Sequence, residues 1–359
     1  MKECDAIIIG AGPSGLASAL VLSKAGLDVT VFEKNEEIGV NPRGETIRPD
    51  HRIEALLGPG FLDSQKIHQV KYRTYFSHTG LKTADREISS WNYIIDWKNF
   101  INEMANQATK AGAKIVTSST VKKAFSSEEG TNTVEVGETK FVSKVVIDCS
   151  GSANSETLSS RQKIPVQKKI LSGFEADENK FYYFFHVDEN APMIATIFPR
   201  GNGEAELLIM LLTDCSSNPL FTPSLKEAEF IMESFAEAHP KFQDITKQCS
   251  VISKYCTTIP MKAPGTSFYT NGIFYTGDNI GLIESRGGSG IKSSIVMAAA
   301  LAEQIHKYWP NPKTNFDKIT HHLQNHPMFK ELQNMDRKFG KSRRLLFSTI
   351  KKPGQMDFM

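Results

Sequence analysis

The sequence has little of what marks a secreted, metal-binding or membrane-embedded protein. Its five cysteines are odd in number and scattered, with no CxxC pair, which argues against a disulfide framework and a cysteine zinc site, so no metal site is expected. No apolar run approaches the roughly 20 residues that cross a bilayer. The formal net charge is only +2, which excludes a field that would attract nucleic acid. The N-terminus shows no signal peptide, and we expect a cytoplasmic protein.

The strongest pattern lies at the start of the chain. An apolar, β-branched run at 6–9 predicts a strand buried in a parallel sheet, and residues 16–25 predict a helix. Residues 28–33 predict a second strand. A glycine-rich turn, Gly10-Ala11-Gly12-Pro13-Ser14-Gly15, connects the first strand to the helix. Strand, turn, helix and strand in this order predict a dinucleotide-binding unit.

Each glycine of the turn has a distinct physical reason. Gly10 makes the tight turn, Gly12 lets a pyrophosphate approach the backbone, and Gly15 lets helix and strand pack closely. The helix then directs free N–H groups toward the phosphates. Glu33, at the end of the second strand and followed by Lys34, can accept hydrogen bonds from ribose hydroxyls. An acid at this position favours FAD or NAD over NADP.

A second glycine-rich junction near the other end of the chain favours FAD over NAD. Residues 272–276 predict a strand that runs into Gly277-Asp278. Gly287-Gly288-Ser289-Gly290-Ile291 follows and precedes a further helix. In a flavoprotein, Asp278 can hold the ribitol chain, and the helix N-terminus can stabilise negative charge on the reduced flavin ring. The alternative is a flexible loop before a helix.

These motifs resemble the FAD-dependent oxidoreductases of the aromatic-hydroxylase type. Residues 10–15 with Glu33, residues 145–151, Gly277-Asp278 and residues 287–291 carry the resemblance. Within that family, the chain is most similar to the geranylgeranyl reductase branch, whose relatives include flavin-dependent halogenases. The resemblance spans about residues 5–305 and implies an α/β fold: a Rossmann-like FAD-binding domain with an inserted antiparallel β-sheet substrate domain and a helical C-terminal tail. It also places Val121 and Gly151 among the residues that bind the cofactor.

The stretch PRGETIRP at 42–49 resembles a flavin-facing segment of the reductase branch. Arg43 stands where those reductases often have cysteine. The resemblance implies that Gly44 lets the backbone approach the flavin and that Arg43 reaches a phosphate or the flavin edge and, with Glu45, tunes its reduction. The alternative is a solvated loop. The chain departs from the branch at Ser285, where proline is common, and at Trp97, where arginine is usual.

The motifs divide the chain into expected domains. The FAD-binding domain takes residues 1–68, 96–155 and 260–308; the substrate domain takes 69–95 and 156–259; and a helical segment takes 309–359. Within the substrate domain, residues 71–77 and 81–93 predict a hairpin, and 181–187, 194–198 and 204–212 predict an antiparallel set of strands. The aromatic run at 181–185 fits either a core or a pocket wall.

The sequence leaves the reaction open between two classes. The resemblance implies an FAD-dependent enzyme that saturates double bonds of a mostly apolar small molecule. The alternative is a monooxygenase-like or halogenase-like enzyme that modifies a small molecule or a protein partner. Reduction of an isolated double bond needs an acid as well as a hydride, and Glu45, His51 and Glu284 are the candidates by sequence position. Without a second dinucleotide fingerprint, electrons would come from transiently bound NAD(P)H or from a separate reductase.

The C-terminal tail is the other candidate contact surface. Residues 337–352 contain seven lysines or arginines and no acid, interleaved with apolar residues. Such a segment can lie at the periphery of an anionic membrane or dock on an acidic protein. A solvated basic helix is the alternative.

Overall fold

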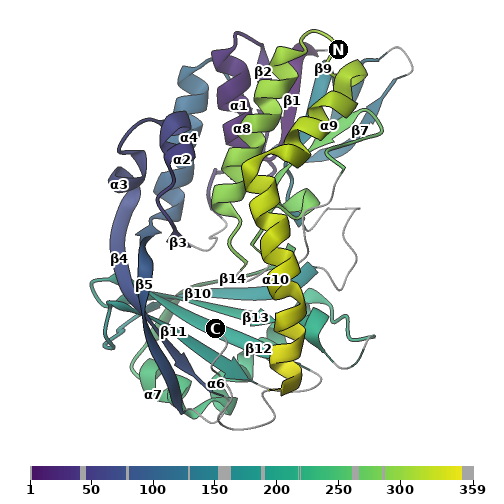
Figure 1. Cartoon of the computed structure of the whole chain (residues 1–359). Helices are drawn as coiled ribbons and strands as arrows, with labels where there is room; N and C mark the ends of the chain where they lie inside the picture. The colour runs from purple at the N-terminus through teal and green to yellow at the C-terminus, as the bar shows by residue number, and fades with distance from the viewer. Residues whose placement is uncertain are drawn as a thin grey trace.

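The computed structural model describes residues 2–40, 46–77, 81–127, 130–152, 163–186, 191–216, 218, 220–260, 267–284 and 288–349. Side chains at 83–91 and 339–349 are outside this description. Two eight-stranded sheets organise the chain, and a layer of helices covers the first of them (Figure 1). The α/β fold class expected from the sequence is confirmed.

The first sheet is built around the N-terminal strand. β1 (Lys2–Ile9) lies parallel to β2 (Val29–Phe32) on one side and to β9 (Thr139–Asp148) on the other. The remaining strands are β15 (Tyr269–Thr270), β16 (Ile273–Tyr275), β6 (Lys114–Val116), β7 (Val121–Ser126) and β8 (Asn132–Val136). Because β16, β9, β1, β2 and β6 are mutually parallel, their carboxyl ends meet at one edge. In sheets of this kind, ligands bind at that edge.

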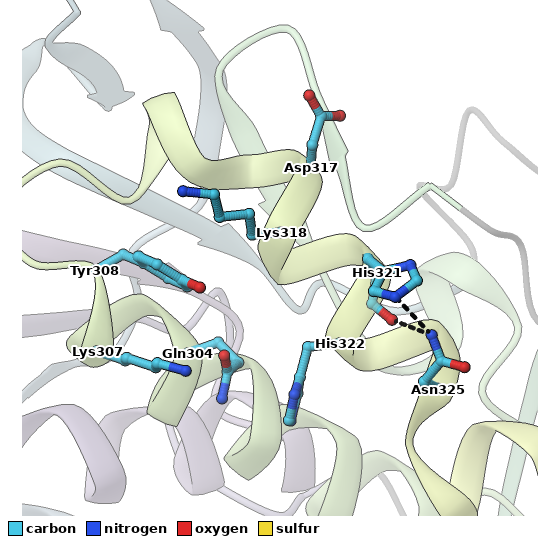
Figure 2. A pocket seen from close by; sticks show the side chains of 8 residues that line it. All are labelled: Gln304, Lys307, Tyr308, Asp317, Lys318, His321, His322 and Asn325. Carbon is cyan, nitrogen blue, oxygen red and sulfur yellow. Dashed lines mark hydrogen bonds between the residues drawn. The ribbon is translucent and has the colours of Figure 1, made fainter.

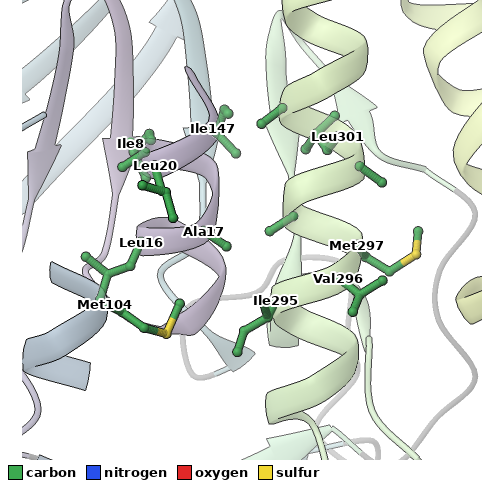
Figure 3. Close-up of a cluster of buried hydrophobic side chains, with 14 of the residues drawn as sticks. Ile8, Leu16, Ala17, Leu20, Met104, Ile147, Ile295, Val296, Met297 and Leu301 are labelled. Atoms are coloured by element: carbon green, nitrogen blue, oxygen red, sulfur yellow. The ribbon is translucent and has the colours of Figure 1, made fainter. Parts of the chain in front are cut away.

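Helices cover one face of this sheet and a β-hairpin covers the other. α1 (Pro13–Lys24), α4 (Trp97–Lys110) and α8 (Ile291–Lys307) pack side by side. Figure 3 shows Leu16 and Leu20 of α1 and Ile295 of α8 in this apolar layer. On the opposite face, Ile7 packs in a separate cluster that includes residues of β7 and β8. Both faces of β1 are therefore buried over residues 6–8, as the apolar run at 6–9 predicts.

The second sheet provides a broad surface beside the first. Its strands, in spatial order, are β14 (Ser250–Pro260), β10 (Lys163–Ser172), β13 (Glu204–Leu211), β12 (Met193–Gly201), β11 (Lys180–His186), β4 (Lys66–Phe76), β5 (Lys82–Ile95) and β3 (Thr46–Ile47). Neighbouring strands are antiparallel except for β4 and β11, which are parallel. These two strands are joined through a long connection and not through a hairpin, which allows the parallel pairing.

Three helices lie against one face of the second sheet. They are α5 (Leu225–Glu233), α6 (Phe235–Ala238) and α7 (Pro240–Thr246). Phe184 is fully buried here and packs edge-on against Phe242, and Phe181 and Phe185 are also buried. The aromatic run at 181–185 therefore contributes to the core. α5 and α6 are separated at Ser234, whose hydroxyl donates a hydrogen bond to the carbonyl of Ile231.

The C-terminal helices fasten the two parts of the molecule together. α9 (Phe316–Asn325) packs against α8, and α10 (Pro327–Thr349) runs from the helix layer to the second sheet (Figure 1). Charged side chains join α10 to α8 and to α2 (His51–Leu57): Glu331 accepts from Lys292 at 3.5 Å and lies 3.9 Å from Arg52. The short elements α3 (Phe61–Gln65), η3 (Thr213–Cys215), η4 (Gly277–Ile280) and η5 (Lys313–Asn315) complete the described chain.

A search of the described residues for long, apolar helices of the kind that span a bilayer gives no candidate.

Candidate functional site

The glycine-rich turn brings the start of α1 close to the ends of two strands. A Cβ at Gly15 would stand 1.9 Å from the carbonyl oxygen of Gly10, so only glycine allows this packing. A Cβ at Gly12, in contrast, would meet no atom within 4 Å. Gly12 is the N-cap of α1 and makes no side-chain cap, and Pro13 begins the helix. The turn therefore combines tight packing on one side with open space at the helix N-terminus, where an anion is stabilised.

The Glu33 carboxylate is held against this turn. It accepts hydrogen bonds from the Ala11 N–H at 2.9 Å, from the Asn35 N–H at 3.0 Å and from the Asn35 side-chain amide at 2.7 Å. An ionised carboxylate has about four acceptor positions, so capacity remains for a further donor. Glu33 is 9% exposed and lines a cavity together with Ala11 and Asn35. Its position and free acceptor capacity fit a ribose hydroxyl.

The second glycine-rich junction packs directly on the first. Gly277 has φ +80°, and a Cβ there would stand 2.3 Å from the Ser14 hydroxyl. The Asn279 side-chain amide donates to Asp148 Oδ1 at 2.7 Å, and the same oxygen accepts from the Ser150 N–H at 2.8 Å. These contacts lock the ends of β9 and β16 together. Asp278, half-buried, is thereby placed in the wall of the same cavity.

The cavity has a volume of about 270 Å³ and lies between the carboxyl edge of the first sheet and one face of the second. Phe198, Leu208, Tyr255, Thr257 and Ile259 of the second sheet form its far wall. Thr46 of β3 also lines it. Residues of the helix layer and its loops, namely Gly39, Trp97, Ile101, Ile283, Ser289 and Ser294, complete the lining with Cys149, Ser150 and Ser152. One wall is rich in glycine and N–H groups, and the opposite wall is mostly apolar.

Most candidate residues from the sequence lie in this cavity. The lining includes Gly10, Gly12, Pro13, Ser14, Glu33, Lys34, Gly151, Asp278, Gly288, Gly290 and Ile291. Gly15 and Gly277 are buried in the packing just described. Arg43, Gly44, Glu45, Ser285 and Gly287 are outside the described residues.

Three other candidates do not line the cavity. Val121 begins β7 and packs on the opposite face of the first sheet. His51 is exposed at the start of α2. Glu284 is half-buried, and its backbone bonds to Ser289 and Gly288 shape the loop before α8.

Some lining residues had only a weak signal in the sequence. Trp97 stands where arginine is usual in the similar family. Its side chain is 6% exposed, and its indole N–H is buried without a hydrogen-bond partner. Tyr255, Thr257 and Ile259 alternate along β14, but nothing local distinguishes that strand from any other strand at a sheet edge.

Cys149 lines the cavity with its thiol in the protonated form. Burial, and secondarily the neighbouring Asp148 carboxylate, raise the pKa of its thiol well above the usual range. The thiolate is the reactive form of cysteine, so a raised pKa disfavours that form at neutral pH.

The described residues fit FAD. The open space at Gly12 suits the pyrophosphate, Glu33 suits the adenosine ribose, and Asp278 suits the ribitol chain. The start of α8 at Gly290 and Ile291 lies beside Asp278, where a flavin ring would continue from the ribitol. The unpartnered indole N–H of Trp97 adds a buried donor at the edge of the same cavity.

A second cavity of about 530 Å³ lies at the other end of α8 (Figure 2). Lys307 and Lys318 approach the ring of Tyr308 at 5.5 and 5.8 Å. His321 and Asn325 are hydrogen-bonded to each other on α9. Among the described residues there is no group of three metal-ligating side chains here or elsewhere. α8 is 17 residues long, so its ends, and hence the two cavities, are separated by about 25 Å.

Comparison with known proteins agrees with this geometry. Residues 3–180 match the family model described as an FAD binding domain. The chain is 22% identical over 320 residues to digeranylgeranylglycerophospholipid reductase 2 of Methanopyrus kandleri, covering 84% of this chain and 76% of that relative. It is 25% identical over 302 residues to digeranylgeranylglycerophospholipid reductase of Methanocaldococcus jannaschii, covering 80% and 73%.

Solved structures share the fold at low sequence identity. A geranylgeranyl bacteriochlorophyll reductase-like protein from Thermoplasma acidophilum aligns with a TM-score of 0.72 at 19% identity, covering 98% of this chain and 92% of that one. The myxobacterial chondrochloren halogenase CndH aligns with a TM-score of 0.72 at 13% identity, covering 100% and 85%. At this level of identity, the likeness shows the fold and does not choose between reduction and halogenation.

Proposed function

Because the chain is an FAD-dependent oxidoreductase with an FAD binding domain at residues 3–180, we propose that it reduces carbon–carbon double bonds of an isoprenoid lipid. The observation that supports this substrate class is the apolar wall opposite the glycine-rich junctions. Phe198, Leu208 and Ile259 line the same cavity as Gly290 and Ile291 at the start of α8. An alkene chain against this wall would exchange water contact for apolar contact. The relatives named as reductases of a digeranylgeranyl lipid point to the same class.

The chain's own residues would hold FAD in an extended form. Gly12 and the N-terminus of α1 would bind the pyrophosphate, Glu33 a ribose hydroxyl, and Asp278 the ribitol. The N-terminus of α8 would stabilise negative charge on the ring edge. When bound and reduced, FAD supplies hydride chemistry, and the protein supplies position and electrostatics.

The remaining partners follow from the same proposal. Electrons would come from NAD(P)H that binds transiently or from a separate reductase. The basic tail at 337–352 would meet a membrane surface or an acidic partner when the enzyme collects an apolar substrate. The roles proposed for Arg43 and Glu45 rest on the resemblance of their segment alone. A role for His51 or Glu284 as the acid rests on sequence position alone, because neither side chain lines the cavity.

The test is a reoxidation experiment without oxygen. Enzyme loaded with FAD and reduced anaerobically is mixed with a digeranylgeranylglyceryl ether phospholipid in detergent, and flavin absorbance is followed. Reoxidation by the lipid, faster than that of free reduced FAD at the same concentration, supports the proposal. Reoxidation that requires oxygen, with no effect of the lipid alone, contradicts it and favours a monooxygenase-like reaction.

A further inference from the structure

The reduction of an isolated double bond requires a proton donor, and the cavity offers few. This inference rests on the function proposed above. Hydride addition to an unactivated alkene leaves charge on the second carbon unless a proton arrives with it. The donor must therefore be a side chain that lines the cavity. Among the described lining residues, the titratable ones are Glu33, Lys34, Cys149, Tyr255 and Asp278.

Four of these five residues lie on the cofactor side of the cavity and not on the side opposite it. Glu33 and Lys34 follow β2 at the nucleotide end, and Glu33 already accepts three hydrogen bonds. Asp278 follows β16 beside the start of α8, and Cys149 follows β9. All four belong to the edge of the first sheet, on the side of the expected cofactor. Tyr255 is the titratable lining residue that the second sheet contributes, so it faces the cofactor side across the substrate space.

The position of Tyr255 is fixed by strand register. It lies on β14 and shares a face with Thr257 and Ile259, which also line the cavity. Its cross-strand partner on β10 is Lys168, and the next partner along the same row, on β13, is the cavity-lining Leu208. Directly opposite residues of antiparallel strands have Cβ atoms about 5 Å apart on the same face. Tyr255, Lys168 and Leu208 therefore form one row across the wall.

Lys168 adds a buried charge within this row of the wall. Its side chain is 3% exposed, and its ammonium lies 3.4 Å from the Glu206 carboxylate, which is 0% exposed. Glu206 is itself paired across strands with Phe198, another residue of the wall. Burying such an ion pair costs free energy, so its presence beside an apolar substrate wall calls for a reason. The pair with Glu206 fixes the Lys168 ammonium in the row that contains Tyr255.

We propose that Tyr255 is the catalytic proton donor of the reduction and that Lys168, anchored by Glu206, is a positioning residue for it. One alkene carbon takes a hydride from the reduced cofactor, which is oxidised by two electrons. The electron pair of the double bond forms a new C–H bond to the phenol proton as the O–H bond of Tyr255 breaks. The phenolate then regains a proton from water, which reaches this half-buried side chain.

The experiment compares two substrates in single-turnover reoxidation without oxygen. The variant is Tyr255→Phe, which keeps the ring, and the matched control is Tyr72→Phe, an exposed tyrosine on β4 of the same sheet. The first substrate is the digeranylgeranyl ether lipid. The second is a nitroalkene, whose nitro group takes up the charge so that hydride addition does not await a proton on carbon.

Tyr255→Phe should slow reoxidation by the lipid by about 100-fold or more, the usual range for a general acid. Its rate with the nitroalkene should match wild type, and Tyr72→Phe should match wild type with both. An unchanged rate with the lipid overturns the inference, as does an equal loss with both substrates, which indicates a structural role. If wild type reacts with the nitroalkene but not with the lipid, the proposed function itself is wrong and the inference goes with it.

Discussion

The backbone N–H of Ala11 donates a 2.9 Å hydrogen bond to the carboxylate of Glu33, which joins the glycine-rich turn after β1 to the end of β2. This bond fixes an acceptor at the nucleotide end of the cavity before any ligand arrives. A group that is already in place costs little to order on binding. The site is therefore preorganised where affinity for the cofactor is expected to arise.

Glu33→Ala should weaken FAD binding without unfolding the protein. Loss of hydrogen bonds to a charged acceptor costs about 1.5–3 kcal/mol, or roughly ten- to hundredfold in Kd. Glu37→Ala is the matched control, because Glu37 is exposed and pairs only at the surface with Lys98. Titration calorimetry of the apoprotein measures both. Equal affinities for Glu33→Ala and wild type would place the nucleotide elsewhere.

Gly12→Ala should lose FAD binding, whereas Gly15→Ala should lose stability. A methyl group at Gly12 has open space, so the apoprotein should keep its Tm but lose FAD. A methyl group at Gly15 would collide with the Gly10 carbonyl oxygen at 1.9 Å, so this variant should lose stability. Thermal unfolding and flavin content of the purified variants separate the two effects. A Gly12→Ala protein that retains bound FAD contradicts the assignment of the pyrophosphate site.

The Lys168–Glu206 pair should show strong coupling. Glu206→Leu leaves the Lys168 ammonium buried without its carboxylate, which costs about 3–5 kcal/mol of the free energy of unfolding. The double variant K168M/E206L should recover most of that loss, since it buries no charge. Urea unfolding of wild type, both single variants and the double variant gives the interaction energy. Additive losses would show that the two groups do not depend on each other.

Lys313 should give the stability a distinct pH dependence. Its ammonium donates to the Gly130 carbonyl at 2.7 Å and to the Asn132 side chain at 2.8 Å, which fastens the β7–β8 hairpin. Burial lowers its pKa from 10.5 to about 8. Between these values the unfolded chain binds a proton that the folded chain has released. The free energy of unfolding therefore rises with pH across this window, and the rise is lost as the pH falls back through it.

The measurement for Lys313 is urea unfolding at several pH values from below 8 to above 10. Lys313→Arg is the informative variant, because arginine keeps its charge over the whole range. The stability of wild type relative to Lys313→Arg should rise as pH increases. A constant difference would show that Lys313 titrates at the same pH in the folded and unfolded chains.

The sequence predicts the local parts of this molecule well. Strand, turn and helix around Gly10 and Gly15, and the acid at position 33, are short-range patterns whose geometry depends on a few neighbouring residues. The cavity wall formed by the second sheet depends instead on contacts between residues far apart in the chain. Tyr255 reaches the cavity because β14 pairs with β10 in one register, and Lys168 lies more than 80 residues earlier in the chain. No local pattern encodes such a pairing.

Val121 is a second case in which pairing between strands, and not the local sequence, decides where a side chain lies. The resemblance places it among the residues that bind the cofactor, and this stays a prediction; its strand pairs with β8, and Val121 packs on the face of the first sheet opposite the helices. Which face a strand residue occupies depends on pairing between strands, since a shift of one residue exchanges the two faces. Residues at strand ends beside glycine turns escape this ambiguity, because the turn itself sets their position.

The most direct test of the account is the mass of the product. Wild-type enzyme, FAD, a chemical reductant and the digeranylgeranylglyceryl ether phospholipid are incubated without oxygen, and the lipid is then analysed by mass spectrometry. The account predicts a gain of two hydrogens for each double bond reduced, and both become deuterium when the reaction runs in D₂O, because the transferable hydrogen of chemically reduced flavin and the phenol proton both come from solvent. A lipid that is unchanged without oxygen and gains an oxygen atom in air would contradict it.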